Sequence, residues 1–233
     1  DDGDLDLTAI NDRQQNNLLK NDGTGVFTDH TGNLPAVQNE SMNAASADVD
    51  GDGDLDVIIA AGSEGLQLLV NDGAAGMTDE TDARIPAFDA FVVQVIPGDV
   101  DDDGDLDLFL ACMGTDLLLV NDGNGLFADE TAALLPGAGE ARTFAAAFAD
   151  VDDDWDLDLF LARPDSQNEL WINAMEEPRV RVSCDPPLVS VGNPVQITVE
   201  ARDEDGIVDL TAAVDGAPLT LTDGTASYTP ATP

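Results

Sequence analysis

An acidic motif with the spacing D-x-D-x-D-G-x-x-D is the feature that most limits how this chain can fold. Residues 99–107 place Asp99, Asp101, Asp103 and Asp107 at motif positions 1, 3, 5 and 9, with Gly104 at position 6. Alternate residues of a tight loop can direct their oxygens at one point, and hard cations such as Ca²⁺ bind six to eight oxygens. Without a cation, two carboxylates about 4 Å apart would repel by about 4 kcal/mol at an effective dielectric of 20. The motif therefore predicts a loop that closes around a hard cation.

The motif recurs along the chain. Residues 48–56 fit it in full, residues 150–158 fit except for Trp155 at the glycine position, and residues 2–6 match its second half. Position 9 falls at Asp6, Asp56, Asp107 and Asp158, in steps of 50, 51 and 51 residues. A solvated acidic turn would explain one copy, but it does not explain copies in register. An internal repeat of this length indicates a repeat architecture.

A second marker keeps the same period. Asn21, Asn71 and Asn121 each begin an Asn-Asp-Gly turn and lie 15, 15 and 14 residues after position 9. Asn-Asp-Gly is a hairpin signal, because Asn and Gly accept positive φ. Four short strands are expected in each unit. The first enters the acidic loop (42–47, 91–96, 143–149), the second leaves it (55–61, 106–111, 157–162), the third ends at the turn, and the fourth follows it (26–29, 77–80, 126–130).

Four strands every 50 residues are typical of a β-propeller blade. An EF-hand is excluded, because its loop needs Glu at position 12 and flanking helices. The residues at position 12 are Ile59, Leu110 and Leu161, in predicted strands.

The unit resembles a known repeat. Its acidic loop between the first two strands is similar to the FG-GAP repeat of integrin α-subunit propellers, and "GDGDLDVIIAAG…LQLLVNDGAAGMTDET" resembles the VCBS/FG-GAP-like repeats of secreted bacterial proteins. The resemblance covers residues 1–175, in units of about 1–40, 41–90, 91–141 and 142–175. It implies a secreted or cell-surface propeller, of bacterial origin, with one Ca²⁺ in each acidic loop.

The resemblance also implies the ligands, at about three calcium sites with a fourth, partial one at the N-terminus. Side chains at positions 1, 3, 5 and 9 and the backbone carbonyl at position 7 would hold each ion. The expected residues are Asp48, Asp50, Asp52, Asp54 and Asp56; Asp99, Asp101, Asp103, Asp105 and Asp107; Asp150, Asp152, Asp154, Asp156 and Asp158; and, in the partial loop, Asp2 and Asp6.

Two departures from the family pattern matter. Trp155 is a bulky residue where positive φ is expected, so the third loop should bind weakly or turn differently. The chain holds two full units and two partial ones, whereas the family closes a ring of about seven blades. Because open sheet edges promote aggregation, further blades are expected upstream of residue 1.

A second domain is expected at residues 178–233. Strands are predicted at 180–184, 195–202, 207–214, 218–221 and 226–229, separated by turn signals. The stretch resembles the Ig-like modules of bacterial surface proteins, and with about five of seven strands it would be truncated. Residues 203–205 could bind calcium at a domain edge, although a solvated turn explains them better. The predicted fold class is all-β: a β-propeller fragment followed by a truncated Ig-like β-sandwich.

Charge limits the partners. The chain has 48 acidic and 8 basic residues, a net charge of −40, so nucleic acid and anionic membranes are not expected to bind it. No run of 18 apolar residues is present, so no membrane insertion is expected. A halophilic adaptation would also explain the acidity, but not the motif spacing. Cys112 and Cys184 are expected to be buried free thiols, although they could pair.

The main functional hypothesis is a module with structural calcium that mediates adhesion or binds a protein or glycan ligand. The alternative is an accessory propeller of a polysaccharide-degrading enzyme whose catalytic part lies outside this chain. No catalytic constellation is visible. His30 is the single histidine, and Arg84, Glu140 and Arg142 lie in loops where they could contact a substrate.

Overall fold

The computed structural model describes residues 3–36, 39–73, 76–135 and 141–173, and beyond these the backbone of five strands between residues 179 and 228. The chain divides into two compact units, residues 1–149 with 157–172 and residues 150–156 with 173–233. The helices of the described part have only three or four residues. The chain is therefore all-β, as predicted.

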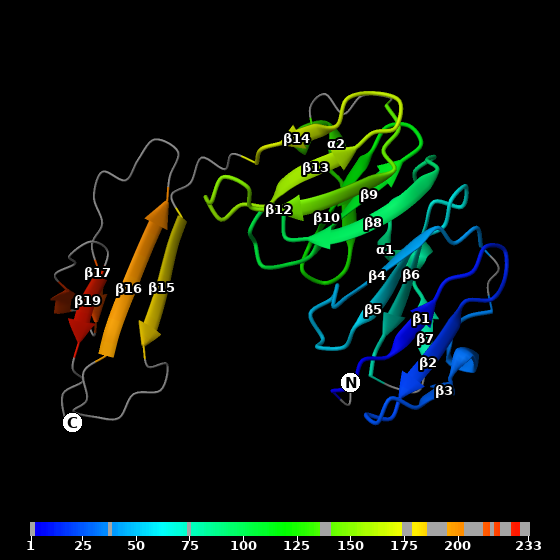
Figure 1. Cartoon of the computed structure of the whole chain (residues 1–233), viewed down its shortest axis with the longest axis horizontal. Helices are drawn as coiled ribbons and strands as arrows, with labels where there is room; N and C mark the ends of the chain where they lie inside the picture. Colours follow the sequence, from blue (N-terminus) through cyan, green and yellow to red (C-terminus); the bar gives the residue numbers. More distant parts are fainter. Residues whose placement is uncertain are drawn as a thin grey trace. The chain divides into compact units, whose positions relative to one another are not determined.

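Two complete four-stranded antiparallel sheets form the centre of the first unit (Figure 1). Strand order follows chain order in both, as in a propeller blade. The first contains β4 (Asn43–Ala47), β5 (Asp56–Ala60), β6 (Leu66–Asn71) and β7 (Met77–Asp79), and the second β8 (Val92–Gly98), β9 (Asp107–Cys112), β10 (Leu117–Asn121) and β11 (Phe127–Asp129). These bounds agree with the predicted strands to within two residues.

Two three-stranded antiparallel sheets accompany them in the first unit. One contains β1 (Leu7–Ala9), β2 (Asn17–Asn21) and β3 (Phe27–Asp29), and the other β12 (Ala145–Ala149), β13 (Asp158–Ala162) and β14 (Glu169–Trp171). Among the described residues, the first has no counterpart of β4 and the last has none of β7. The described residues of the first unit therefore hold two sheets of four strands and two of three.

Apolar clusters join each sheet to the next, because successive residues of a strand point to opposite faces. In β9, Leu108 and Leu110 pack in one cluster with Ile58 of β5, whereas Phe109 packs in another with Leu159 of β13. A third cluster joins β2 to β5 in the same way. Every residue of β5 and β9 is buried. Because other sheets cover both faces of these strands, their sequences are continuous apolar runs.

A short helical turn follows β3, β7 and β11, and the sequence did not lead us to expect it. The turns are η1 (Thr31–Asn33), α1 (Thr81–Arg84) and α2 (Thr131–Leu134). In α1, Asp79 Oδ1 accepts a hydrogen bond from Thr81 N (3.1 Å), and Thr81 Oγ1 accepts one from Leu68 N (2.9 Å). The Asp-x-Thr triplet that begins each turn could have revealed it. No helix of the described residues is long and apolar enough to span a membrane.

The second unit contains a three-stranded sheet and a hairpin. β15 (Arg179–Asp185), β16 (Val195–Arg202) and β19 (Thr225–Tyr228) pair antiparallel, and β17 (Ala212–Val214) pairs with β18 (Ala217–Leu219). Strands thus lie at all five predicted places, although β17 covers only the end of the predicted strand 207–214. The Ig-like sandwich stays a prediction, and residues 203–205 lie outside the described part.

Candidate metal centres

The first complete acidic loop, residues 48–56, connects β4 to β5 and is held by its own carboxylates. Asp48 accepts hydrogen bonds from Gly51 N (2.8 Å) and Gly53 N (3.0 Å), and Asp52 accepts one from Asp54 N (2.9 Å). Gly53 has φ +96°, which favours glycine at position 6. The loop therefore takes the sharp turn predicted from its sequence.

The second loop, residues 99–107, connects β8 to β9 with matching bonds. Gly104, also at φ +96°, donates its N–H to Asp99 (3.1 Å), and Asp105 donates its N–H to Asp103 (3.0 Å). The first and second complete loops, one repeat apart in the chain, therefore have the same turn.

The aspartate at position 9 braces each loop from within the protein. Asp107 is fully buried, and its Oδ1 and Oδ2 accept the backbone N–H groups of Asn121 (2.9 Å) and Val100 (3.0 Å). Asp56, which is also fully buried, makes the two equivalent bonds. Position 9 therefore ties the acidic loop to the third strand of its own sheet.

Positions 1, 3 and 9 converge in both loops. Ligand oxygens of Asp48, Asp50 and Asp56 lie within 4.8 Å of one another, and so do those of Asp99, Asp101 and Asp107. Among the described residues, Asp50 Oδ1 and Asp101 Oδ1 are buried oxygens without a hydrogen-bond partner. A buried acceptor without a partner is costly. Three converging carboxylates with a spare buried oxygen fit a hard cation such as Ca²⁺.

Burial also disfavours the charge of these groups. It raises the pKa of Asp107 to about 6, against the bonds from Asn121 and Val100, and the charge of Asp101 adds to the rise. Burial likewise raises the pKa of Asp56 and, together with the charge of Asp103, that of Asp101. A bound cation would offset both the burial and the mutual repulsion.

Three overlapping segments of the chain, residues 1–59, 48–110 and 99–161, match the family model of the FG-GAP-like repeat. The chain belongs to the FG-GAP-like repeat family. No curated protein matches it. Among solved structures, it is similar to an Agrocybe aegerita lectin described for specific recognition of non-reducing terminal N-acetylglucosamine, with 16% identity and a TM-score of 0.39. The match covers 92% of this chain and 64% of the lectin chain, so this chain spans less than two thirds of that length.

The aspartates at positions 5 and 7 of the two complete FG-GAP-like loops do not belong to the converging groups. Asp52 and Asp103 are exposed and lie outside these groups. The side chains of Asp54 and Asp105 lie against the hairpin glycines Gly73 and Gly123, where they would contact a Cβ. The ligand roles predicted for positions 5 and 7 stay predictions.

The third loop takes the same turn within residues 150–156. Asp150 accepts hydrogen bonds from the N–H groups of Asp154 and Trp155 (both 3.1 Å), and Asp154 accepts one from Asp156 (3.0 Å). Trp155 has φ +79°, so it adopts the glycine conformation, at a cost of about 1–3 kcal/mol. The third loop does not turn differently. Asp158 begins β13 in the first unit, and the ligand roles of Asp150, Asp152, Asp154, Asp156 and Asp158 stay predictions.

The partial loop at the N-terminus keeps the bracing bond. Asp6 Oδ1 accepts a hydrogen bond from Asn21 N (2.8 Å), as position 9 does in the complete loops. Asp2 lies outside the described residues. The structure therefore describes the second half of one loop here, and its ion remains a prediction.

The asparagine of the hairpin has a structural role that sequence reasoning missed. Asn121 Oδ1 accepts the N–H groups of Gly123 (3.2 Å) and Gly125 (3.0 Å). Its Nδ2 donates to Leu106 O (3.1 Å) and to Val49 O (2.7 Å), which belongs to the acidic loop of the preceding repeat. The hairpin turn therefore also links its own repeat to the acidic loop of the preceding repeat. The recurrence of Asn at this place was the available signal.

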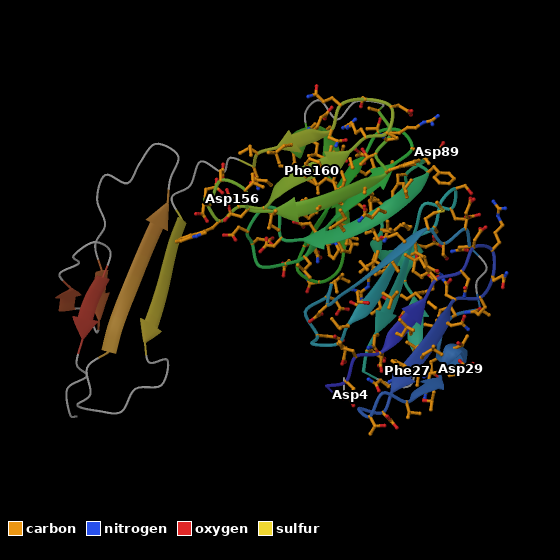
Figure 2. All side chains as sticks on the ribbon, in the orientation of Figure 1. Asp4, Phe27, Asp29, Asp89, Asp156 and Phe160 are labelled. Carbon is orange, nitrogen blue, oxygen red and sulfur yellow. The ribbon has the colours of Figure 1, made fainter. Side chains whose placement is uncertain are left out.

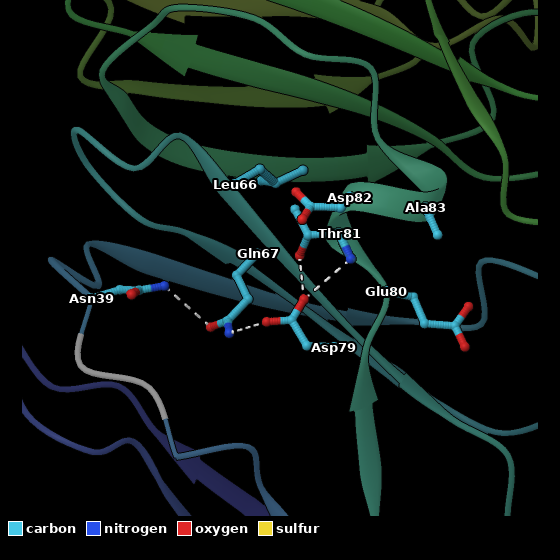
Figure 3. Close-up of a pocket in the computed structure, with 8 residues that line it drawn as sticks. All are labelled: Asn39, Leu66, Gln67, Asp79, Glu80, Thr81, Asp82 and Ala83. Atoms are coloured by element: carbon cyan, nitrogen blue, oxygen red, sulfur yellow. Dashed lines mark hydrogen bonds between the residues drawn. The ribbon is translucent and has the colours of Figure 1, made fainter.

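A polar pocket lies at the other end of the β4–β7 sheet (Figure 3). In β5, Asp56 adjoins the acidic loop, and Ala60 at the far end pairs with Leu66 of the pocket. Gln67 is buried there and donates to Asp79 (2.8 Å). The pocket has a volume of about 520 Å³ and is lined by Asn39, Leu66, Gln67, Asp79, Glu80, Thr81, Asp82 and Ala83.

The residues considered for catalysis do not come together in the described part of the chain. His30 is the N-cap of η1, and Arg142 forms an exposed ion pair with Asp165 (3.6 Å). Arg84 pairs instead with Asp50 of the first loop (3.1 Å). Glu140 lies outside the described residues.

Proposed function

We propose that this chain is a secreted or cell-surface, calcium-binding β-propeller module, with structural ions and with loops that bind a protein or carbohydrate ligand. The observation that carries the calcium proposal is the pair of buried, unpartnered oxygens, Asp50 Oδ1 and Asp101 Oδ1, in equivalent carboxylate groups of successive repeats. The proposal includes no catalytic step.

Calcium suits these groups better than other metals. The donors are oxygens only, which hard cations prefer, and Ca²⁺ tolerates the irregular geometry that Mg²⁺ does not. Extracellular modules bind Ca²⁺ with Kd values of roughly 0.1–1 mM. At ten times Kd, one such ion stabilises the native state by about 1.4 kcal/mol. Calcium would then both stabilise the module and restrict its full stability to calcium-rich compartments.

A thermal melt tests the calcium proposal. The purified chain is unfolded in EDTA and then across a calcium titration, with magnesium as the control. The expected result is a melting temperature that rises near millimolar calcium and does not respond to magnesium. An unchanged melting temperature would remove calcium from the proposal, and melting against NaCl would then test the halophile alternative.

A matched pair of variants assigns the effect to the loop. Asp101→Asn removes the charge of a half-buried carboxylate in the second loop, whereas Asp89→Asn removes an exposed charge outside the loops. Asp101→Asn should reduce the calcium-induced shift of the melting temperature, and Asp89→Asn should preserve it. Equal shifts in the two variants would contradict the assignment.

The ligand-binding face of the proposal is the pocket of Figure 3, at the opposite end of the sheet from the ions. Its amide and carboxylate groups are suited to hydrogen bonding with sugar hydroxyls or peptide groups. A glycan array and a peptide array would supply probes. Asp82→Lys, at the exposed rim, should abolish binding of any hit, whereas Asp122→Lys, on a hairpin at the acidic-loop end, should not. A hit insensitive to Asp82→Lys would place the ligand elsewhere.

The outer faces of the two partial sheets are proposed to pack against further FG-GAP-like repeats. Phe27 and Phe160 are exposed on these sheets (Figure 2), whereas Phe127, in the place of Phe27 two repeats later, is buried. Phe160→Asp should be tolerated in this chain, but should destabilise a protein with further repeats by more than about 2 kcal/mol. Equal tolerance in both proteins would contradict this packing.

A further inference from the structure

Arg84 brings a positive charge to the first acidic loop. It is the last residue of α1, and its Nη2 lies 3.1 Å from Asp50 Oδ2. The pair is largely buried, with 20% of the Arg84 side chain and 13% of the Asp50 side chain exposed. Its Nε also pairs with Glu80. A guanidinium is therefore held beside the carboxylate whose other oxygen, Oδ1, is buried without a partner.

The hairpin of the next repeat holds this arginine in place. Arg84 Nη1 donates to Asn124 O (2.7 Å). Gly125, which follows, has φ +75° and leaves no room for a Cβ beside Arg84 Nη1, while Asp50 Cβ would lie 3.0 Å from that Cβ. The positive φ and the close approach together favour glycine at residue 125. Arg84 is fixed between two repeats and has little freedom to leave Asp50.

The position of Arg84 is apolar in the two neighbouring repeats. Leu134 occupies the place of Arg84 in the next repeat, at the end of α2, and Leu34 occupies it in the preceding one. Among the ion pairs of the described residues, none includes Asp101, the counterpart of Asp50. Asp50 and Asp101 are therefore equivalent carboxylates, and of these two only Asp50 is paired with a cation among the described residues.

We propose that Arg84 is a built-in counter-charge that weakens cation binding at the first loop, so that the two complete loops fill at different calcium concentrations. This inference rests on the proposed calcium function. Calcium affinity in carboxylate loops depends on the charge of the ligand set, and Arg84 cancels part of that charge. Without calcium, the same cation relieves repulsion in the first loop, whereas the second loop depends on the ion.

Arg84 also orients Asp50, and this effect would act in the opposite direction. A group that orients a metal ligand typically strengthens binding. However, the first loop is already braced by the bonds from Gly51 and Gly53 to Asp48 and by the two bonds to Asp56. The loop should therefore keep its shape without Arg84, and the charge effect should dominate.

Calorimetric calcium titration of single-loop proteins tests the inference. Asn substitutions at Asp99, Asp101, Asp150 and Asp152 remove the second and third sites and retain the first. Asn substitutions at Asp48, Asp50, Asp150 and Asp152 remove the first and third sites and retain the second. In the first-loop protein, Arg84→Gln should bind calcium about tenfold more tightly, and Arg84→Lys, which keeps the charge, should change affinity by less than about twofold. In the second-loop protein, Arg84→Gln should have no effect. Arg13→Gln, which removes an exposed arginine, is the matched control and should change neither protein.

A second variant, with the opposite expected effect on calcium affinity, tests the inference if Arg84→Gln does not fold. Glu80→Gln removes the anion that partly neutralises Arg84, so it should weaken calcium binding at the first loop by about threefold. Unchanged or weaker binding in folded Arg84→Gln, or equal effects of Gln and Lys, would overturn the inference. If Arg84→Gln does not fold, unchanged or tighter binding in Glu80→Gln overturns it. No binding by the second-loop protein would instead refute the calcium function itself.

Discussion

Phe109 and Phe160 occupy the same place in two consecutive repeats, 51 residues apart, yet Phe109 is fully buried and Phe160 is 43% exposed. Phe109 packs between its own sheet and β13, and its ring meets Phe148 edge-on with centroids 6.3 Å apart. Phe160 points to the opposite face of β13 from Leu159 and Leu161 because side chains alternate along a strand. The burial of this position thus depends on whether another sheet covers it.

Phe109 and Phe160 give a prediction about stability, in which the Phe160 variant is the control for the Phe109 variant. Phe109→Ala should destabilise the chain by about 3–5 kcal/mol, because it leaves a cavity between two sheets. Phe160→Ala should cost less than about 1 kcal/mol, since much of that ring is already in water. Urea unfolding of both variants measures the difference. Equal losses would show that the outer face of β13 is covered in solution.

The repeat made most of the fold predictable. Two independent markers with one period, the acidic loop ending at Asp56 or Asp107 and the turn beginning at Asn71 or Asn121, predicted both the strands and their grouping. The spacing predicted that the side chains of positions 1, 3, 5 and 9 converge; the oxygens of positions 1, 3 and 9 do so, and position 5 lies outside the group. Short sequence motifs therefore predict those parts of the structure that depend on residues close together in the chain.

Contacts between repeats could not be predicted in this way. Asn121 Nδ2 reaches Val49 O across 72 residues, and Arg84 reaches Asn124 across 40. Such pairs depend on how two sheets pack, which no period in the sequence specifies. The prediction that Trp155 would alter the turn was wrong for a different reason. The sequence correctly indicated strain at this position, but the bonds from Asp154 and Trp155 to Asp150 preserve the turn in spite of it.

Positions 9 and 5 of the second loop should separate the structural role of a carboxylate from its ion-binding role. Asp107→Ala leaves the N–H groups of Asn121 and Val100 without an acceptor, so it should cost about 2–4 kcal/mol even in EDTA. Asp103→Ala should cost less than about 1 kcal/mol in EDTA, because the residue is exposed and accepts one loop N–H. Denaturant melts with and without calcium measure both, and Asp103→Ala should lose more in calcium. A calcium-independent effect of Asp103→Ala would remove position 5 from the ligand set.

The turn at position 6 requires positive φ, and alanine can test this. Gly104 has φ +96° and open space around it, so Gly104→Ala should cost about 1–2 kcal/mol through backbone strain alone. Gly114 also has open space but is not in the positive-φ region. Gly114→Ala should therefore be neutral or slightly stabilising, by up to about 1 kcal/mol. If both variants have the same thermal stability, the second loop does not hold the turn described here.

Cys112 should be chemically silent in the folded protein. It is a free, fully buried thiol, and burial together with the charge of Asp116 raises its pKa to about 12. At pH 8 the thiolate fraction should be about 1,000-fold below that of an ordinary cysteine, and the thiolate is the reactive form. In a Cys184→Ser background, a disulfide reagent should label Cys112 only on unfolding in urea. Ser63→Cys, at an exposed position in a background without the native cysteines, should react at once. Labelling of native Cys112 at that rate would mean that β9 opens readily, which the tight packing on both of its faces does not allow.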